Sequence, residues 1–134
     1  MIVVDASALI EVLLNTSAAP RIADRLFDRG ETLHAPHLLD VEVAQVLRRY
    51  ARTGEISAPR ADAALEDFTA FPIARYPHQP FLPRIWQLRN NATAYEAAYL
   101  ALAEVLDAPL LTRDSRLARS IGHRARIELA RSGS

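Results

Sequence analysis

Short runs of consecutive apolar residues alternate along this chain with longer stretches whose apolar residues recur at helical spacing. The runs at 2–4, 32–35 and 109–112 are bounded by polar residues, proline or glycine, as expected of strands buried in a sheet. Weaker runs at 73–75 and 126–129 predict two further strands.

The stretches between these runs predict helices. The clearest covers residues 38–52, where Leu39, Val43 and Val46 share one face and Gly54 follows the last turn. The other helices are expected at residues 8–14, 20–29, 57–71, 94–106 and 114–118. In contrast, the four prolines of segment 71–86 argue against long regular structure before Pro83. Its aromatic residues are expected mainly in the core, with a partner-facing patch as the alternative: Phe71, Tyr76, Phe81 and Trp86.

Alternation of strands and helices predicts an α/β protein with a three-layer α/β/α fold and a central, mostly parallel sheet. No linker or repeat interrupts the pattern. We therefore expect a single domain over residues 1–130, followed by a short polar tail at 131–134.

Composition excludes several kinds of chemistry. All sixteen basic residues are arginines, so the chain has no lysine for a Schiff base or a P-loop, and its four glycines are too dispersed for a dinucleotide-binding turn. A receiver domain, which needs a lysine, is also disfavoured. Without cysteine there is no thiol nucleophile and no thiolate zinc site. No secretory signal or membrane span is expected, and we predict a cytoplasmic protein.

Acidic residues follow two of the predicted strands. Asp5 comes directly after the first strand, and Asp114 follows the strand that ends near Thr112. Ligands of parallel sheets bind beyond the carboxyl ends of the strands, so these two acids are expected at one edge. Glu42 lies beside the apolar stripe of helix 38–52, and Glu96 lies in the first turn of helix 94–106. Four converging carboxylates would repel one another unless a divalent cation, Mg²⁺ or Mn²⁺, neutralised them.

Each acid also has a simpler explanation. Asp5 and Asp114 can cap the helices that follow them, and Glu42 can be a solvated residue. Glu96 completes a capping box with Thr93, a pattern that explains it without any metal. Two further acids compete from less favourable positions, Asp40 and Asp107.

Six arginines lie between residues 113 and 131, with Asp114 and Glu128 as the only acids there. Arg113 and Arg116 flank the candidate metal ligand, and guanidinium groups bind phosphate well, so we expect both to bind substrate. The alternative is a solvated helix face and a basic tail. The histidines lack metal-site spacing and are expected at the surface or in caps: His34, His37, His78 and His123.

Four segments together resemble the PIN-domain ribonucleases, and among them the VapC toxins of bacterial toxin–antitoxin pairs. The matching segments are 2–8, 35–49, 93–104 and 110–117. The resemblance implies that Asp5, Glu42, Glu96 and Asp114 bind Mg²⁺ or Mn²⁺ and cleave RNA endonucleolytically. It also implies a homodimer and a VapB-like antitoxin that blocks the site. We expect the hydroxyls of Ser7 and Thr112 to hydrogen-bond the ligating carboxylates.

The expected function is thus that of a toxin that hydrolyses tRNA, rRNA or mRNA and restrains translation and growth. One position departs from the family, which usually has aspartate where this chain has Glu96. Glutamate keeps the charge but is one methylene longer, and active sites tolerate only small displacements. A catalytically weakened module that binds RNA or a partner is therefore the alternative. Position 116, where relatives sometimes have another acid, is Arg116, so no fifth ligand is expected.

Overall fold

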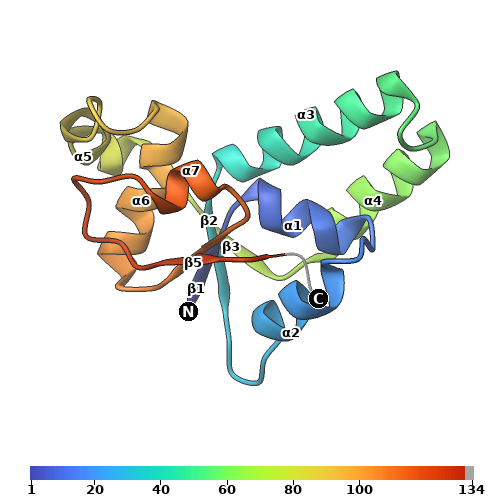
Figure 1. Ribbon diagram of the computed structural model, residues 1–134, viewed down its shortest axis with the longest axis horizontal. Helices are drawn as coiled ribbons and strands as arrows, with labels where there is room; N and C mark the ends of the chain where they lie inside the picture. Colours follow the sequence, from blue (N-terminus) through green and yellow to red (C-terminus); the bar gives the residue numbers. More distant parts are fainter. Residues whose placement is uncertain (132–134) are drawn as a thin grey trace.

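Five parallel strands form one sheet in the order β3-β2-β1-β4-β5 in a computed structural model that describes residues 1–131 (Figure 1). The strands are β1 (Ile2–Val4), β2 (Leu33–Pro36), β3 (Ile73–Tyr76), β4 (Leu110–Thr112) and β5 (Ile127–Leu129). All five lie where the hydrophobic pattern predicted them. The predicted polar tail, apart from Arg131, lies outside the described residues.

Helices cover both faces of this sheet and complete three layers. One face carries α1 to α4 and the other carries α5 and α6 (Figure 1). The helices are α1 (Ala6–Leu13), α2 (Ala19–Leu26), α3 (Leu38–Thr53), α4 (Ala58–Ala70), η1 (Gln79–Phe81), α5 (Leu82–Gln87), α6 (Ala94–Leu106) and α7 (Ser115–Ala118). The sequence did not predict α5. Pro83 is compatible with this helix because it occupies the first turn, where a missing backbone N–H removes no helical hydrogen bond.

Strands β1 and β4 are buried on both faces. In β1, the side chains of Ile2 and Val4 belong to the core beneath α1 to α4, whereas Val3 belongs to the core beneath α5 and α6. Leu110 and Leu111 of β4 divide between the same two cores. This burial explains why both strands are continuous apolar runs and not alternating ones.

The order of the strands places a crevice at one edge of the sheet. From β1 the chain adds β2 and then β3 on one side, and afterwards crosses the sheet to place β4 on the other side of β1. Parallel sheets bind ligands at such a switch point, beyond the carboxyl ends of the strands. Here the residues that follow β1 and β4 occupy that place.

Two expectations about individual side chains are wrong. Trp86 is 67% exposed, because α5 is short and its inward face is taken by Ile85, and the Arg89 guanidinium covers the indole ring at 4.7 Å. His34 is buried in β2, where its ring nitrogens lie 2.7 Å from the hydroxyls of Thr32 and Tyr76. These two hydroxyl partners stabilise a buried neutral imidazole, and burial lowers the pKa of His34.

Candidate active site

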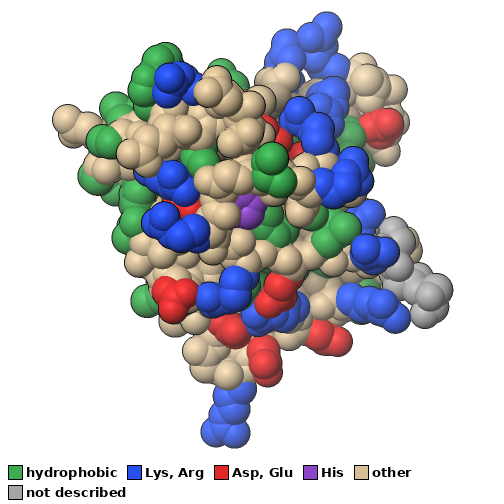
Figure 2. Space-filling model, turned by 60° about the vertical axis from the view of Figure 1, so that its left-hand side comes forward, with side chains coloured by type: hydrophobic (Ala, Val, Ile, Leu, Met, Phe, Trp, Pro, Cys, Tyr) green, Lys and Arg blue, Asp and Glu red, His purple; other side chains and the backbone are tan. Residues whose placement is uncertain are grey.

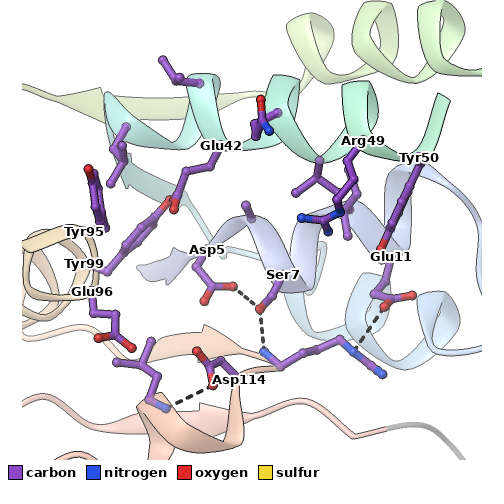
Figure 3. Close-up of a pocket in the computed structure, with 18 residues that line it drawn as sticks. Asp5, Ser7, Glu11, Glu42, Arg49, Tyr50, Tyr95, Glu96, Tyr99 and Asp114 are labelled. Carbon is purple, nitrogen blue, oxygen red and sulfur yellow. Dashed lines mark hydrogen bonds and ion pairs between the residues drawn. The ribbon is translucent and has the colours of Figure 1, made fainter. Parts of the chain in front are cut away.

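A pocket of about 630 Å³ opens at the carboxyl ends of β1 and β4 and is lined by all four predicted acids. Asp5 follows β1 and Asp114 follows β4, whereas Glu42 comes from α3 and Glu96 from α6. Figure 3 shows their carboxylates facing one common space. The fold thus brings together four residues that are far apart in the sequence.

Asp5 is the most buried and most firmly held of these acids, with 7% of the residue exposed. Its Oδ1 accepts hydrogen bonds from Ser7 Oγ at 2.7 Å and from the backbone N–H of Ala8 at 3.2 Å, which caps α1. Its Oδ2 accepts a hydrogen bond of 2.5 Å from Thr112 Oγ1. Burial raises the pKa of Asp5, and the charge of Asp114 raises it further, although the hydrogen bonds oppose this.

The hydroxyls of Ser7 and Thr112 connect the ends of the two central strands. Ser7 Oγ accepts a hydrogen bond from the backbone N–H of Arg113 at 2.9 Å, and Thr112 Oγ1 accepts one from the N–H of Asp114 at 3.0 Å. Each hydroxyl therefore donates to Asp5 and accepts from the segment after β4. These bonds fix Asp5 and Asp114 relative to each other.

Asp114 caps α7 and also faces the pocket. Its Oδ1 accepts hydrogen bonds from the backbone N–H groups of Arg116 and Leu117 at 2.9 and 3.3 Å. Its Oδ2 makes no hydrogen bond within residues 1–131 and is available to a ligand. The capping role suggested by the sequence and a role in the pocket are thus compatible.

Glu42 is held by a residue that nothing in the sequence pattern singled out. The hydroxyl of Tyr99, on α6, donates a hydrogen bond of 2.5 Å to Glu42 Oε1, and Tyr99 is only 3% exposed. Burial raises the pKa of Glu42, the Tyr99 hydrogen bond lowers it, and the charge of Asp5 raises it. The one sequence signal for Tyr99 is that it lies one helical turn after Glu96, on the same side of α6.

Glu96 uses both carboxylate oxygens for other contacts. Oε1 accepts the backbone N–H of Thr93 at 2.8 Å and so completes the predicted capping box. Oε2 pairs with Arg116 Nη2 at 3.0 Å, although the Arg116 side chain is 71% exposed. The competing acids are also paired, and away from the pocket: Asp40 with Arg75 at 2.7 Å and Asp107 with Arg126 at 2.7 Å.

Arg113 forms part of the pocket wall, as expected of a residue near Asp114. Its Nε lies 3.3 Å from Oε1 of Glu11, an acid on α1 that also hydrogen-bonds Thr16. Arg49 and Tyr50 of α3 line the same end of the pocket (Figure 3). Neither Glu11 nor Arg49 could be recognised from the sequence, because their positions become meaningful only once α1 and α3 are packed side by side.

The donor set of this pocket suits a hard divalent cation. Within residues 1–131, no three acidic or histidine side chains lie close enough together to form a complete metal cluster. Mg²⁺ does not require one, since it is usually held by one or two carboxylates together with water and substrate phosphate. The charge of Asp114 disfavours ionisation of Asp5, and a bound cation would offset that repulsion.

Comparison with known proteins identifies the family. Residues 2–121 match the PIN domain family. The chain is also 46% identical to ribonuclease VapC12 of Mycobacterium tuberculosis over 129 residues, which are 96% of this chain and 98% of that protein. The chain belongs to the VapC ribonucleases of the PIN-domain family. This VapC-family chain is similarly 45% identical to ribonuclease VapC1 of the same organism, over 96% of this chain and 97% of that protein.

The fold of the VapC-family chain is also found in a solved structure. It resembles VapBC2 from Rickettsia felis, crystallised with a DNA fragment from their promoter, with a TM-score of 0.71 and 11% identity over 96% of this chain and 98% of that one. Family membership confirms the resemblance inferred from the sequence and the class of enzyme, an endoribonuclease. In the described residues, no helix is long and apolar enough to cross a membrane.

Proposed function

We propose that this VapC-family chain is a Mg²⁺-dependent endoribonuclease toxin that hydrolyses tRNA, rRNA or mRNA in the cytoplasm and thereby restrains translation and growth. One observation carries the proposal: four carboxylates from separate elements line one pocket at the carboxyl ends of β1 and β4. Helix capping explains three of these acids one at a time, but it does not explain why they converge, because each added carboxylate increases the repulsion in the pocket.

Asp5 and Asp114 would hold the ion most directly, with Glu42 and Glu96 completing the set. Asp5 is pre-oriented by three hydrogen bonds, and Asp114 has an oxygen free of hydrogen bonds within the described chain. When bound, the ion would polarise the phosphodiester and lower the pKa of the attacking water. Mn²⁺ fits the same oxygen donors.

The chain's own side chains supply orientation and charge. Ser7 and Thr112 keep the Asp5 carboxylate in place, and Tyr99 keeps Glu42 directed into the pocket. Arg113 lines the pocket and pairs with Glu11, and once its guanidinium leaves that acid it can neutralise negative charge that develops on a phosphate. Arg116 is a second substrate-binding residue in this proposal, and it must leave Glu96 to reach a phosphate.

Protein partners fit the rim of the same pocket. Val41 and Tyr95 line the pocket and are 68% and 64% exposed, a combination of apolar surface and acidic interior that suits a protein segment carrying a basic residue. We propose that a VapB-like antitoxin covers this rim and that the toxin is a homodimer. Mass measurement in solution, with and without the antitoxin, tests both.

The activity itself is tested with purified protein and structured RNAs in Mg²⁺. Asp5→Asn should abolish cleavage, and chelation of the metal should do the same to the unmodified protein. Asp24→Asn is the matched control, because Asp24 is exposed on α2, outside the pocket. Undiminished cleavage by Asp5→Asn would refute the site.

The alternative function, a weakened module that binds RNA or a partner, is favoured by one observation. Both oxygens of Glu96 are occupied, by Thr93 and by Arg116. If Glu96 is the defect, the chain binds RNA without metal-dependent turnover, and Glu96→Asp restores cleavage. If the chain already cleaves RNA at rates that Glu96→Asp does not raise, the alternative is wrong.

A further inference from the structure

The structure separates the six arginines of residues 113–131 into two groups. Two pair with acids through their guanidinium groups, Arg116 with Glu96 and Arg126 with Asp107. The side chain of Arg124 is exposed, and only its backbone N–H donates to Glu104. The other three line a single groove, and they are Arg113, which also pairs with Glu11, Arg119 and Arg131. This distinction depends on the fold and is invisible in the sequence.

This groove, which we call the arginine groove, has a volume of about 700 Å³ and runs between α7 and the end of β5. Its remaining lining is small or apolar, with Ser115 and Ala118 from α7 and Leu129 from β5. No acidic side chain lines it among the described residues. The wall of the groove itself therefore supplies no negative charge.

The charges around the arginine groove leave it positive. Arg119 and Arg131 are exposed, and neither has a carboxylate partner within residues 1–131. The nearby Glu128 is engaged elsewhere, since both of its oxygens accept hydrogen bonds from Arg25 at 2.8 and 2.9 Å. Figure 2 shows arginine side chains concentrated along the right-hand side of one face, whereas acidic side chains are more frequent lower down.

The arginine groove adjoins the acidic pocket. Arg113 lines both of them, and α7, which Asp114 caps, forms the wall between. A chain that leaves the pocket past Arg113 therefore enters the groove directly. The pocket holds acids, which suit a cation and one phosphate, and the groove holds arginines, which suit further phosphates.

We propose that the arginine groove binds the backbone phosphates of the RNA strand next to the bond that is cleaved. This inference rests on the proposed ribonuclease function, and it assigns the path by which the strand leaves the pocket. An RNA strand carries one negative charge per nucleotide, so the phosphates outside the pocket gain from an adjoining track of exposed guanidinium groups. Interactions of this kind position the strand without reading its sequence.

The test is RNA binding by the Asp5→Asn variant, which keeps the strand intact during measurement. Fluorescence anisotropy is recorded over a range of salt concentrations with a short labelled oligoribonucleotide that fills only the pocket and with a longer one that extends beyond it. Arg119→Ala and Arg131→Ala are added singly and together. Arg29→Ala is the matched control, because it removes the same charge from an exposed loop before β2, on the other side of β1 from β4 and β5.

The double variant should bind the longer RNA more weakly, and equally so for different sequences. The slope of log affinity against log salt should fall by about 0.7 for each phosphate that an arginine no longer neutralises, so by about 1.4 for two. Binding of the short RNA and all binding by Arg29→Ala should stay unchanged.

Three outcomes separate this inference from the function on which it rests. Unchanged affinity and salt slope for the longer RNA in the double variant overturn the groove assignment, whether or not the unmodified protein cleaves RNA. Weaker long-RNA binding in a chain that cleaves no RNA in Mg²⁺ supports the groove and refutes the ribonuclease. If an acidic peptide binds less tightly to the double variant while RNA binding is unchanged, the groove serves a protein partner and the proposal is wrong.

Discussion

The hydroxyl of Tyr99 donates a 2.5 Å hydrogen bond to Oε1 of Glu42 and so joins α6 to α3 across the acidic pocket. Tyr99 is almost fully buried, and its own pKa is raised by that burial and by the charge of Glu42. It therefore remains protonated and acts as a permanent donor. Glu42 is fixed in direction by a residue that carries no charge itself.

Tyr99→Phe should lower kcat/KM by roughly tenfold or more, because a hydrogen bond to a charged group contributes about 1.5–3 kcal/mol. It should also raise the pKa of Glu42, since this hydrogen bond favours the ionised form, and so move the acidic limb of the pH–rate profile to higher pH. Tyr50→Phe removes a hydroxyl from the far end of the pocket and is the control. A lower rate with an unmoved profile would mean that Tyr99 only supports packing.

Asp5→Asn should stabilise the metal-free protein at neutral pH. The folded-state pKa of Asp5 is raised above its ordinary value. Its contribution to stability is therefore fully present below about pH 3.8, the ordinary pKa, and is lost as the pH rises through the raised pKa. Asparagine removes this loss and its amide oxygen still caps the helix, and we expect that gain to exceed the loss of the hydrogen bond from Thr112, which an amide nitrogen cannot accept. Thermal unfolding in a chelator should show a midpoint higher by about 4 °C per kcal/mol gained. A lower unfolding midpoint of Asp5→Asn at neutral pH would contradict the predicted stabilisation.

Divalent metal should make the unmodified chain more stable than Asp5→Asn, the reverse of the order in chelator. A ligand that binds only the folded state adds about 2.7 kcal/mol to the free energy of unfolding at one hundred times its Kd. Mg²⁺ should therefore raise the unfolding midpoint of the unmodified chain and of Asp24→Asn, but not that of Asp5→Asn. Equal metal shifts in all three proteins would place the ion outside the pocket.

Arg116→Ala should strengthen metal binding several-fold while weakening RNA binding. The change removes a positive charge near the pocket and releases Oε2 of Glu96, which pairs with Arg116 at 3.0 Å. Calorimetric titration with Mn²⁺ measures the first effect and anisotropy with labelled RNA the second. Arg29→Ala should change neither, and metal affinity that falls in Arg116→Ala would show that Glu96 needs its arginine.

Glu104→Gln should destabilise the fold by about 1–3 kcal/mol, because it leaves Arg84 and the Arg124 N–H without a charged acceptor. Arg84 lowers the pKa of Glu104. The stability that Glu104 contributes is therefore present above about pH 4.5, its ordinary pKa, and is lost as the pH falls through the lowered pKa. Denaturant titrations at neutral and acidic pH should show the variant's deficit shrinking in acid. Glu55→Gln, at an exposed position, should show no deficit.

Residues that act through local geometry could be predicted from the sequence. Asp5 and Asp114 follow apolar strands, and the position of an acid after a parallel strand already implies the functional edge of the sheet. The capping box of Thr93 and Glu96 depends on four consecutive residues and was equally visible. The assignment of Glu42 to the site depended on the family resemblance, because an acid on the flank of a helix can equally be a solvated surface residue.

Features that depend on distant residues could not be predicted. Tyr99 and Glu42 are 57 positions apart, and Arg25 and Glu128 are 103 apart, so only the packed fold reveals either pair. The burial of His34 depends in the same way on Tyr76, a strand away. The exposure of Trp86 could not be predicted either, because an aromatic side chain is buried only if another element packs against its face of the helix.

The pairing of β1 with β4 has a consequence for how the toxin is made. The hydroxyl of Thr112 donates to the carboxylate of Asp5 across 107 positions of sequence, and β4 lies next to β1, the central strand of the sheet. A nascent chain that has not yet delivered β4 lacks the partner strand, the bond to Asp5 and Asp114 itself. The acidic pocket therefore cannot be complete until β4 and Asp114 have been synthesised, so the end of the chain decides when the site first forms.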